Sequence, residues 1–275
     1  MLIVAALRWS DQRAAVDPLT GEVRTDARTS GASAADRAAL EHALRIAEAF
    51  DGRCLAMTVG PVEAEEMLRE ALSVGAHEVV RVEGPAATVT EDGSETARLL
   101  LDGLPDRPDV IVCGDHSADR GTGATPAFLA QRLGACQALG LIELEAVDGG
   151  LRAVRRLDGG RRERLVFGAP AVCSVEPAGT TLRRAPLPAT IAARTARIPV
   201  AHAGSLRYLR AGTAKAFRPR PRALPAPVGS EPHQRMLALT GALIERTPPA
   251  LLRPATVEEA ARELLDYLRR HGYTP

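Results

Sequence analysis

Short apolar runs alternate with amphipathic segments of helical length through the first half of this 275-residue chain. The runs lie at Leu2–Leu7, Arg53–Val59, Glu78–Val82 and Asp109–Gly114. Between them, over 40–47 and 64–71, apolar residues recur at the i, i+3, i+4, i+7 spacing of a helix with one apolar face. Shorter helices are expected over Ser94–Leu101 and Pro126–Leu133. The alternation predicts an α/β fold with a doubly wound, mostly parallel sheet covered by helices.

The pattern changes after Gln137, where short apolar runs are separated by Asp-Gly-Gly turns. The expected strands are Leu141–Val147, Leu151–Leu157, Arg164–Phe167 and Ala171–Val175. Turns of the Asp-Gly type join antiparallel neighbours. We therefore expect these four strands to form a small antiparallel extension of the sheet.

A basic, proline-rich stretch follows the strands. The whole chain has a net charge of +1, yet 177–230 contains ten basic residues and no acidic one, which leaves −9 on the rest. Because periodicity fails over Pro177–Pro232, we predict an extended arm that is ordered by contact with something else. A capped amphipathic helix is expected from Thr256 to Gly272. We divide the chain into an α/β domain (1–200), an arm (201–235) and a C-terminal helical segment (236–275).

The uneven charge indicates an acidic protein partner and no nucleic acid. All basic residues except Lys215 are arginine, and asparagine is absent, so a biased composition explains many of the arginines. The basic stretch offers only Tyr208 and Phe217 for stacking on bases. No window approaches the length of a membrane-spanning helix, and Leu2–Leu7 lacks the basic flank of a signal peptide. We therefore expect a cytoplasmic protein with no membrane insertion.

The segment from Gly114 to Thr125 leads from a predicted strand through a glycine- and hydroxyl-rich loop into a helix. Such a junction gathers free backbone N–H groups and the positive end of the helix dipole, which together hold a phosphate. The hydroxyls of Thr122 and Thr125 add donors. Because the loop matches neither G-x-G-x-x-G nor a Walker motif, a tight turn with a helix cap explains it equally well.

Hydrolytic and metal chemistry have weaker support in the sequence. His116, Ser117 and Asp119 are residue types of a catalytic triad, but triad members come from separate loops and no G-x-S-x-G motif is present. His42 and His77 are expected in structural roles. The cysteines, Cys54, Cys113, Cys136 and Cys173, form no C-x-x-C pair, and three of them lie in apolar runs. We predict buried free thiols, no metal site and no catalytic residue.

Several collinear segments resemble the small (beta) subunit of electron transfer flavoproteins. Residues 4–11 are similar to V-x-V-K-R-V-x-D, 16–23 to D-P-x-T-G-E-V, and 39–45 to A-L-E-E-A-L-R. Residues 58–61 resemble S-x-G-P, 68–76 resemble L-R-E-A-L-A-M-G-A, and 114–123 resemble G-K-Q-S-I-D-G-D-T-G. Residues 187–198 are similar to L-P-G-I-M-K-A-K-K-K-P-I at identical length. The order and spacing of these segments carry the resemblance.

The resemblance implies a Rossmann-like, adenine-nucleotide-binding fold and an electron carrier subunit that catalyses nothing alone. An alpha subunit would hold the redox-active FAD, while this chain would bind AMP, with FAD as the other candidate. The implied nucleotide-binding residues are Ala6, Ser33, Val59, Ser117, Arg120, Gly123, Ala124 and Thr125. A dehydrogenase would dock at the loop around Leu187, flanked by Arg183 and Arg184.

Four positions depart from the family pattern. Ser33 replaces an asparagine, Ala124 a glutamine, Asp115 a lysine and Arg156 an acidic residue. Fewer side-chain donors would then reach a nucleotide, which keeps AMP, FAD and an empty site open. The long basic arm resembles the mycofactocin-associated beta subunit. The alternatives are a stand-alone adenine-nucleotide-binding regulator of the universal-stress type and, third, a hydrolase.

Overall fold

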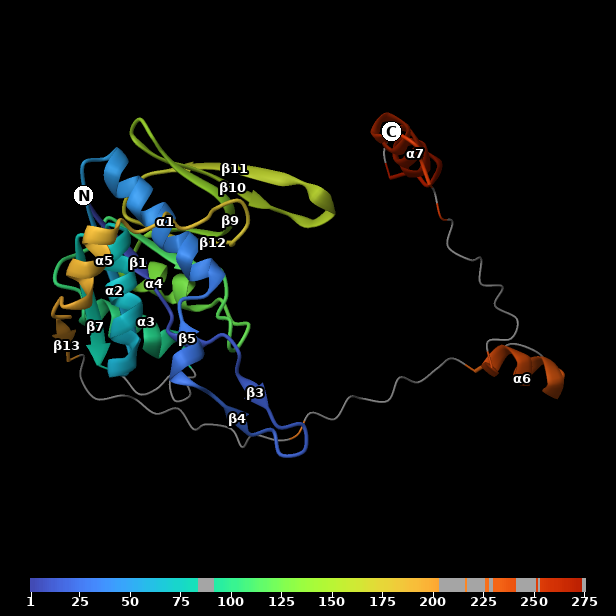
Figure 1. Ribbon diagram of the computed structural model, residues 1–275, viewed down its shortest axis with the longest axis horizontal. Coiled ribbons are helices and arrows are strands. Elements are labelled where there is room, and N and C mark those ends of the chain that lie inside the picture. The colour runs from blue at the N-terminus through green and yellow to red at the C-terminus, as the bar shows by residue number, and fades with distance from the viewer. Residues whose placement is uncertain are drawn as a thin grey trace. The chain divides into compact units, whose positions relative to one another are not determined.

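The computed structural model describes residues 1–83, 92–202, 216, 226–227, 230–240, 251 and 253–273. It divides the chain into two compact units, Met1–Phe217 and Arg218–Pro275. The helices of the first unit are α1 (Ala34–Ala49), α2 (Glu65–Val74), α3 (Gly93–Asp102), α4 (Thr125–Leu133) and α5 (Leu187–Arg194). The second unit contains α6 (Pro232–Thr240) and α7 (Val257–Arg270). Figure 1 shows the elements in chain order.

The main sheet contains nine strands among the described residues. Its strands are β1 (Leu2–Ala6), β6 (Arg53–Gly60), β7 (Glu78–Glu83), β8 (Val110–Gly114), β9 (Cys136–Val147), β10 (Gly150–Arg156), β11 (Arg162–Phe167), β12 (Ala171–Val175) and β13 (Val200–Ala201). They lie in the order β11-β10-β9-β12-β8-β1-β6-β7-β13. Two small antiparallel pairs lie between β1 and α1, formed by β2 (Ser10–Asp11) with β5 (Ser30–Gly31) and by β3 (Ala15–Val16) with β4 (Val23–Arg24).

The central strands of the sheet are parallel and change direction of winding at β1. Strand β1 pairs with β6 on one side and with β8 on the other, both in parallel. The chain moves outward from β1 to β6 and β7, and then returns to the opposite side of β1 with β8. The predicted doubly wound α/β fold is confirmed, with its switch point between β1 and β8.

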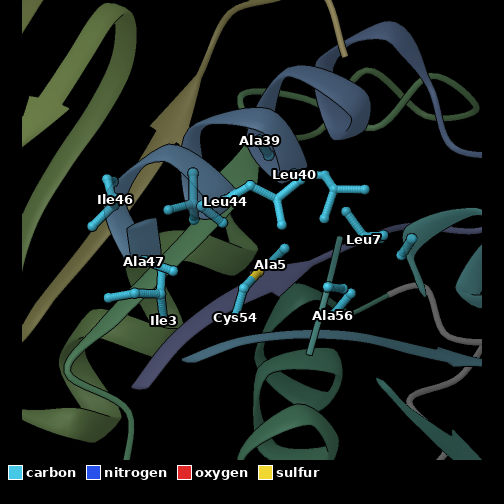
Figure 2. Packing of buried hydrophobic residues seen from close by; sticks show 14 of the residues in the cluster. Ile3, Ala5, Leu7, Ala39, Leu40, Leu44, Ile46, Ala47, Cys54 and Ala56 are labelled. Carbon is cyan, nitrogen blue, oxygen red and sulfur yellow. The ribbon is translucent and has the colours of Figure 1, made fainter. Parts of the chain in front are cut away.

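Helices cover both faces of the parallel strands. The side chains of Ile3 and Ala5 pack beneath α1 and α2 in one core cluster, and Figure 2 shows α1 lying over them. Leu2 and Val4 point to the other face and belong to a second cluster with residues of α3 and α4. Strand β1 is buried along its whole length, which explains its uninterrupted apolar sequence.

The start and the end of the helices follow local signals. Ser33 begins α1 with a capping box, in which its hydroxyl accepts from the Asp36 N–H and the Asp36 carboxylate accepts from the Ser33 N–H. Helix α2 ends at Gly75 and α4 at Gly134, both with positive φ. Thr256 caps α7, and Gly272 follows its end with φ 72°, as predicted.

Two predictions about the second half of the first unit are wrong in detail. Strands β9, β10 and β11 are antiparallel as expected, but β12 pairs in parallel with β8 and with the first part of β9. The stretch that follows is also more regular than predicted. Residues 187–194 form α5, which packs on α2, and Val200–Ala201 add a short strand beside β7.

Most of the predicted arm over 201–235 lies outside the described residues. Within the described parts of the chain, no helix is both long enough and apolar enough to cross a bilayer. Cys54, Cys113 and Cys173 are buried free thiols, as predicted, while Cys136 is exposed.

Candidate functional site

A cavity opens where β1, β6 and β8 end, next to the first turns of α1 and α4. About 730 Å³ of empty space lies between its lining residues, and this figure includes open solvent at the mouth. The position matters because ligands of open α/β sheets bind outside the carboxyl ends of the strands at the switch point. The lining residues are Ala6, Leu7, Arg8, Trp9, Asp36, Val59, Thr96, Leu100, Cys113, Gly114, His116, Ser117, Thr122, Gly123, Thr125 and Pro126.

The loop between β8 and α4 is closed by its own hydrogen bonds. The Ser117 N–H donates to the Thr122 carbonyl at 2.8 Å, and the Gly121 N–H donates to the Ser117 carbonyl at 2.8 Å. The Thr122 N–H also donates to the Ser117 hydroxyl at 3.3 Å. The loop leads into the first turn of α4, where Thr125 lines the cavity.

Gly123 is required by a close backbone approach inside this loop. An ideal Cβ at this position would lie 2.2 Å from the Asp115 carbonyl oxygen. Real Cβ atoms do not come this close to backbone, so any side chain would displace the loop. The glycine therefore allows the backbone of the loop to fold back beside the cavity.

Arg8 connects the end of β1 to the same loop. Its Nε donates to Asp119 Oδ1 at 2.7 Å and its Nη2 donates to Asp119 Oδ2 at 2.6 Å. The Arg8 N–H donates to Asp36 Oδ1 at 3.1 Å. Although burial opposes it, the hydrogen bonds from Arg8 lower the pKa of Asp119. These hydrogen bonds connect the end of β1, the first turn of α1 and the loop before α4 around the cavity.

Asp36 is a carboxyl group buried in the cavity wall. Burial raises its pKa, against hydrogen bonds from the Ser33 hydroxyl and from the N–H groups of Arg8 and Ser33. An anionic group of a ligand would be repelled from the Asp36 side once that carboxyl is ionised. The loop and the first turn of α4 form the part of the wall that suits a phosphate.

The structure brings five of the eight predicted nucleotide-binding residues into the cavity wall. These five are Ala6, Val59, Ser117, Gly123 and Thr125. Ser33, Arg120 and Ala124 are not among the lining residues. Ser33 is committed to the capping box of α1, Ala124 is the residue before α4, and Arg120 Nε lies 3.7 Å from the Asp119 carboxylate.

Several lining residues were not predicted. Arg8 and Trp9 follow β1 after Leu7, and their place behind the first strand of a doubly wound sheet was the available signal. Asp36 could have been found from the S-x-x-D capping pattern. Thr96 had no such signal. It belongs to α3, which packs on the face of the sheet opposite α1.

The three residues considered for hydrolysis do not form a relay. His116 Nδ1 lies 2.7 Å from Asp115 Oδ1, and the Ser117 hydroxyl pairs with the Thr122 hydroxyl at 3.2 Å. Asp119 is engaged by Arg8. Among the described residues, no cluster of three His, Cys, Asp or Glu side chains could hold a metal ion. Burial raises the pKa of the Cys113 thiol in the cavity wall, which keeps it protonated.

The predicted docking residues lie on the segment that leads into α5. Leu187, the first residue of α5, is 72% exposed, and Ile191 one turn later is 59% exposed. Arg184 is exposed and forms no ion pair among the described residues. Arg183 differs, because it forms ion pairs with Glu41 and Glu48 of α1.

Known proteins resemble this chain over the same region. Residues 22–205 match the model of the electron transfer flavoprotein domain, which is more than half of the chain. "Protein FixA" from Rhizobium meliloti is 28% identical over 189 residues, which cover 66% of this chain and 64% of that protein. The "Electron transfer flavoprotein subunit beta" of Mycobacterium bovis is 32% identical over 145 residues, covering 50% and 53%. The protein of that name from Methylophilus methylotrophus is 30% identical, covering 51% and 55%.

The chain belongs to the electron transfer flavoprotein domain family. Its curated relatives identify it further as a protein of the beta-subunit type, which confirms the predicted resemblance. The matched region spans between about half and two thirds of the length of these relatives. The regulator of the universal-stress type is not favoured by these matches. The mycofactocin-associated subtype stays a prediction.

Proposed function

We propose that this chain is the small subunit of a heterodimeric electron transfer flavoprotein. It pairs with an alpha subunit, binds an adenine nucleotide in the cavity at the switch point and presents Leu187 to a dehydrogenase. It assists the passage of electrons from that dehydrogenase to an acceptor and catalyses no reaction alone. The proposed compartment is the cytoplasm. The observation that carries the proposal is the family match, combined with a cavity lined by the loop between β8 and α4 and by the ends of β1, β6 and β8.

The residues of the cavity fit an adenine nucleotide by their chemistry. The loop before α4 offers the hydroxyls of Ser117, Thr122 and Thr125 and a helix N-terminus on the side that suits a phosphate. Val59, Leu100 and Pro126 provide apolar surface on which a purine can pack. We propose AMP as the ligand, with FAD as the alternative.

The redox chemistry of the complex would come from FAD held by the alpha subunit. Within this chain, His116 pairs with Asp115, the Ser117 hydroxyl pairs with the Thr122 hydroxyl, and Asp119 pairs with Arg8. The function of this chain is then to bind, to complete the cavity wall and to present a docking surface.

The experiment that tests the proposal is purification of the tagged chain from its host, followed by a visible spectrum and analysis of nucleotides released on denaturation. A yellow complex with a larger subunit, one FAD and one further adenine nucleotide is expected. A colourless homodimer would contradict the heterodimer, whatever nucleotide it contained. A yellow heterodimer without the second nucleotide would contradict only the assignment of the cavity.

A further inference from the structure

Arg183 donates four hydrogen bonds of 3.0 to 3.3 Å to glutamates of α1. Its backbone N–H and its Nε each donate to Glu41 Oε2 at 3.0 Å, and its Nη2 donates to Glu41 Oε1 at 3.3 Å. The same Nη2 donates to Glu48 Oε2 at 3.1 Å, and Nη1 also contacts Glu48. The guanidinium therefore bridges two carboxylates that lie two turns apart on α1.

The partner of this bridge is a buried carboxylate. The Glu41 side chain is only 4% exposed and also pairs with Arg45 at 2.7 Å. Although burial would raise the pKa of Glu41, hydrogen bonds from Arg183 and Arg45 lower it. A buried ionised group must keep its partners, because an uncompensated charge in the interior is costly. The positive charge of Arg183 is thus committed to α1.

The segment before α5 is attached to α1 at a second point. Thr180 lies three residues before Arg183 in the chain. Its hydroxyl is 3.1 Å from Nε2 of the buried His42. Leu182 and Ala185 pack against the core cluster beneath α1 and α2. Residues 177–186 have no regular secondary structure of their own, so these contacts fix the path of the backbone into α5.

We propose that Arg183 is a positioning residue, which fixes the path of the chain into Leu187 through Glu41 and Glu48 and does not itself contact the docked dehydrogenase. The inference rests on the proposed function, in which Leu187 is the docking residue. It gives Arg183 and Arg184 different roles, although the sequence alone predicts that both flank the docking site. Arg184, which is exposed and forms no ion pair within the described residues, remains available to an acidic partner.

The role of Arg183 is tested by replacing it with lysine, which keeps the charge and removes the planar fork. The measurement uses the purified heterodimer and the dehydrogenase that reduces it, taken from the same host. Arg183→Lys is expected to raise the KM for the dehydrogenase about tenfold at unchanged kcat, because a charge-assisted hydrogen bond is lost. It should also speed amide hydrogen exchange over 184–190. Arg152→Lys, the matched control, makes the same change in an ion pair with Glu145 on β10 and β9 and should change neither.

The outcomes distinguish this inference from the function on which it rests. If Leu187→Ala raises the KM and Arg183→Lys does not, the positioning role is overturned and docking stands. If Arg183→Lys raises the KM without faster exchange, Arg183 contacts the dehydrogenase and the inference is again overturned. If Leu187→Ala leaves the KM unchanged, the docking function itself is wrong. Glu48→Gln, a change at a half-exposed residue, decides the question should Arg183→Lys fail to fold, since it weakens the same bridge.

Discussion

Arg8 and Asp119 form two parallel hydrogen bonds, of 2.7 and 2.6 Å, that join the end of β1 to the loop before α4. The two residues are 111 positions apart in the chain. Their side chains are 24% and 19% exposed, so the pair is partly shielded from solvent. A paired guanidinium and carboxylate in this setting hold geometry better than an exposed pair does.

Asp119→Asn is expected to destabilise the first unit and loosen the cavity. Loss of the charged acceptor should lower the free energy of unfolding by about 1–3 kcal/mol, because hydrogen bonds to charged groups are removed from a partly buried site. Denaturant unfolding and nucleotide retention would measure the two effects. The control is Glu145→Gln, which breaks the exposed pair with Arg152 on β9 and β10. Equal effects of the two substitutions would contradict the role of the Arg8–Asp119 pair.

Gly123→Ala tests the close approach inside the loop. A Cβ that meets the Asp115 carbonyl oxygen at 2.2 Å must displace backbone. Overpacking of this kind costs about 1–3 kcal/mol, and the bound nucleotide should be lost with the loop geometry. Gly123→Asp adds a carboxylate and should expel the nucleotide as well. Gly31→Ala, where a Cβ meets nothing within 4 Å, is the control for thermal unfolding and nucleotide content. Retention of nucleotide in both Gly123 variants would show that the cavity is assigned wrongly.

The sequence was sufficient for the strands that are buried on both faces. Strands β1 and β8 are continuous apolar runs, and burial on both faces is what such runs indicate. The same property made β12 ambiguous, because an apolar run of five buried residues does not reveal whether it pairs in parallel. The Asp-Gly-Gly turns precede β10 and β11 only, so they predicted those two partners correctly.

Helix α5 was missed because its order comes from distant contacts. Only Ala193 is buried within it, which is too little apolar periodicity to identify a helix from sequence. The segment that leads into α5 is held by Arg183, whose N–H donates to Glu41, a residue 142 positions away in the chain. The cavity likewise combines local and distant contributions. Ser117 and Gly123 lie in one local motif that the sequence reveals, whereas the pairing of Arg8 with Asp119 depends on the fold.

Leu187→Ala should weaken reduction by the partner dehydrogenase and leave folding and subunit assembly intact. The side chain is 72% exposed, and surface substitutions of this kind change stability by less than about 0.5 kcal/mol. Loss of an apolar anchor should appear as a raised KM for the dehydrogenase. Leu19→Ala, at an 85% exposed leucine beside β3, is the matched control. Turnover unchanged by Leu187→Ala, or equally reduced by Leu19→Ala, would argue against docking at α5.

His42 should make the stability of the first unit depend on pH. Its Nδ1 lies 3.0 Å from the Leu144 carbonyl and must carry hydrogen, since a carbonyl only accepts, so Nε2 accepts from the Thr180 hydroxyl in the neutral state. Burial lowers the pKa of His42 from its ordinary value of 6.5, with Arg45 adding to the shift and Glu41 and the Leu144 carbonyl opposing it.

Because the folded pKa lies below the unfolded one, the unfolded chain binds the proton more readily as the pH falls below about 6.5. The free energy of unfolding should therefore decrease on acidification, with a slope from this group of at most about 1.4 kcal/mol per pH unit. His42→Gln should be less stable at pH 7, because it loses one or both hydrogen bonds, yet show a flatter dependence between pH 6.5 and the folded pKa. Denaturant unfolding of both proteins across this range makes the comparison. Parallel curves would mean that His42 is not the group that titrates.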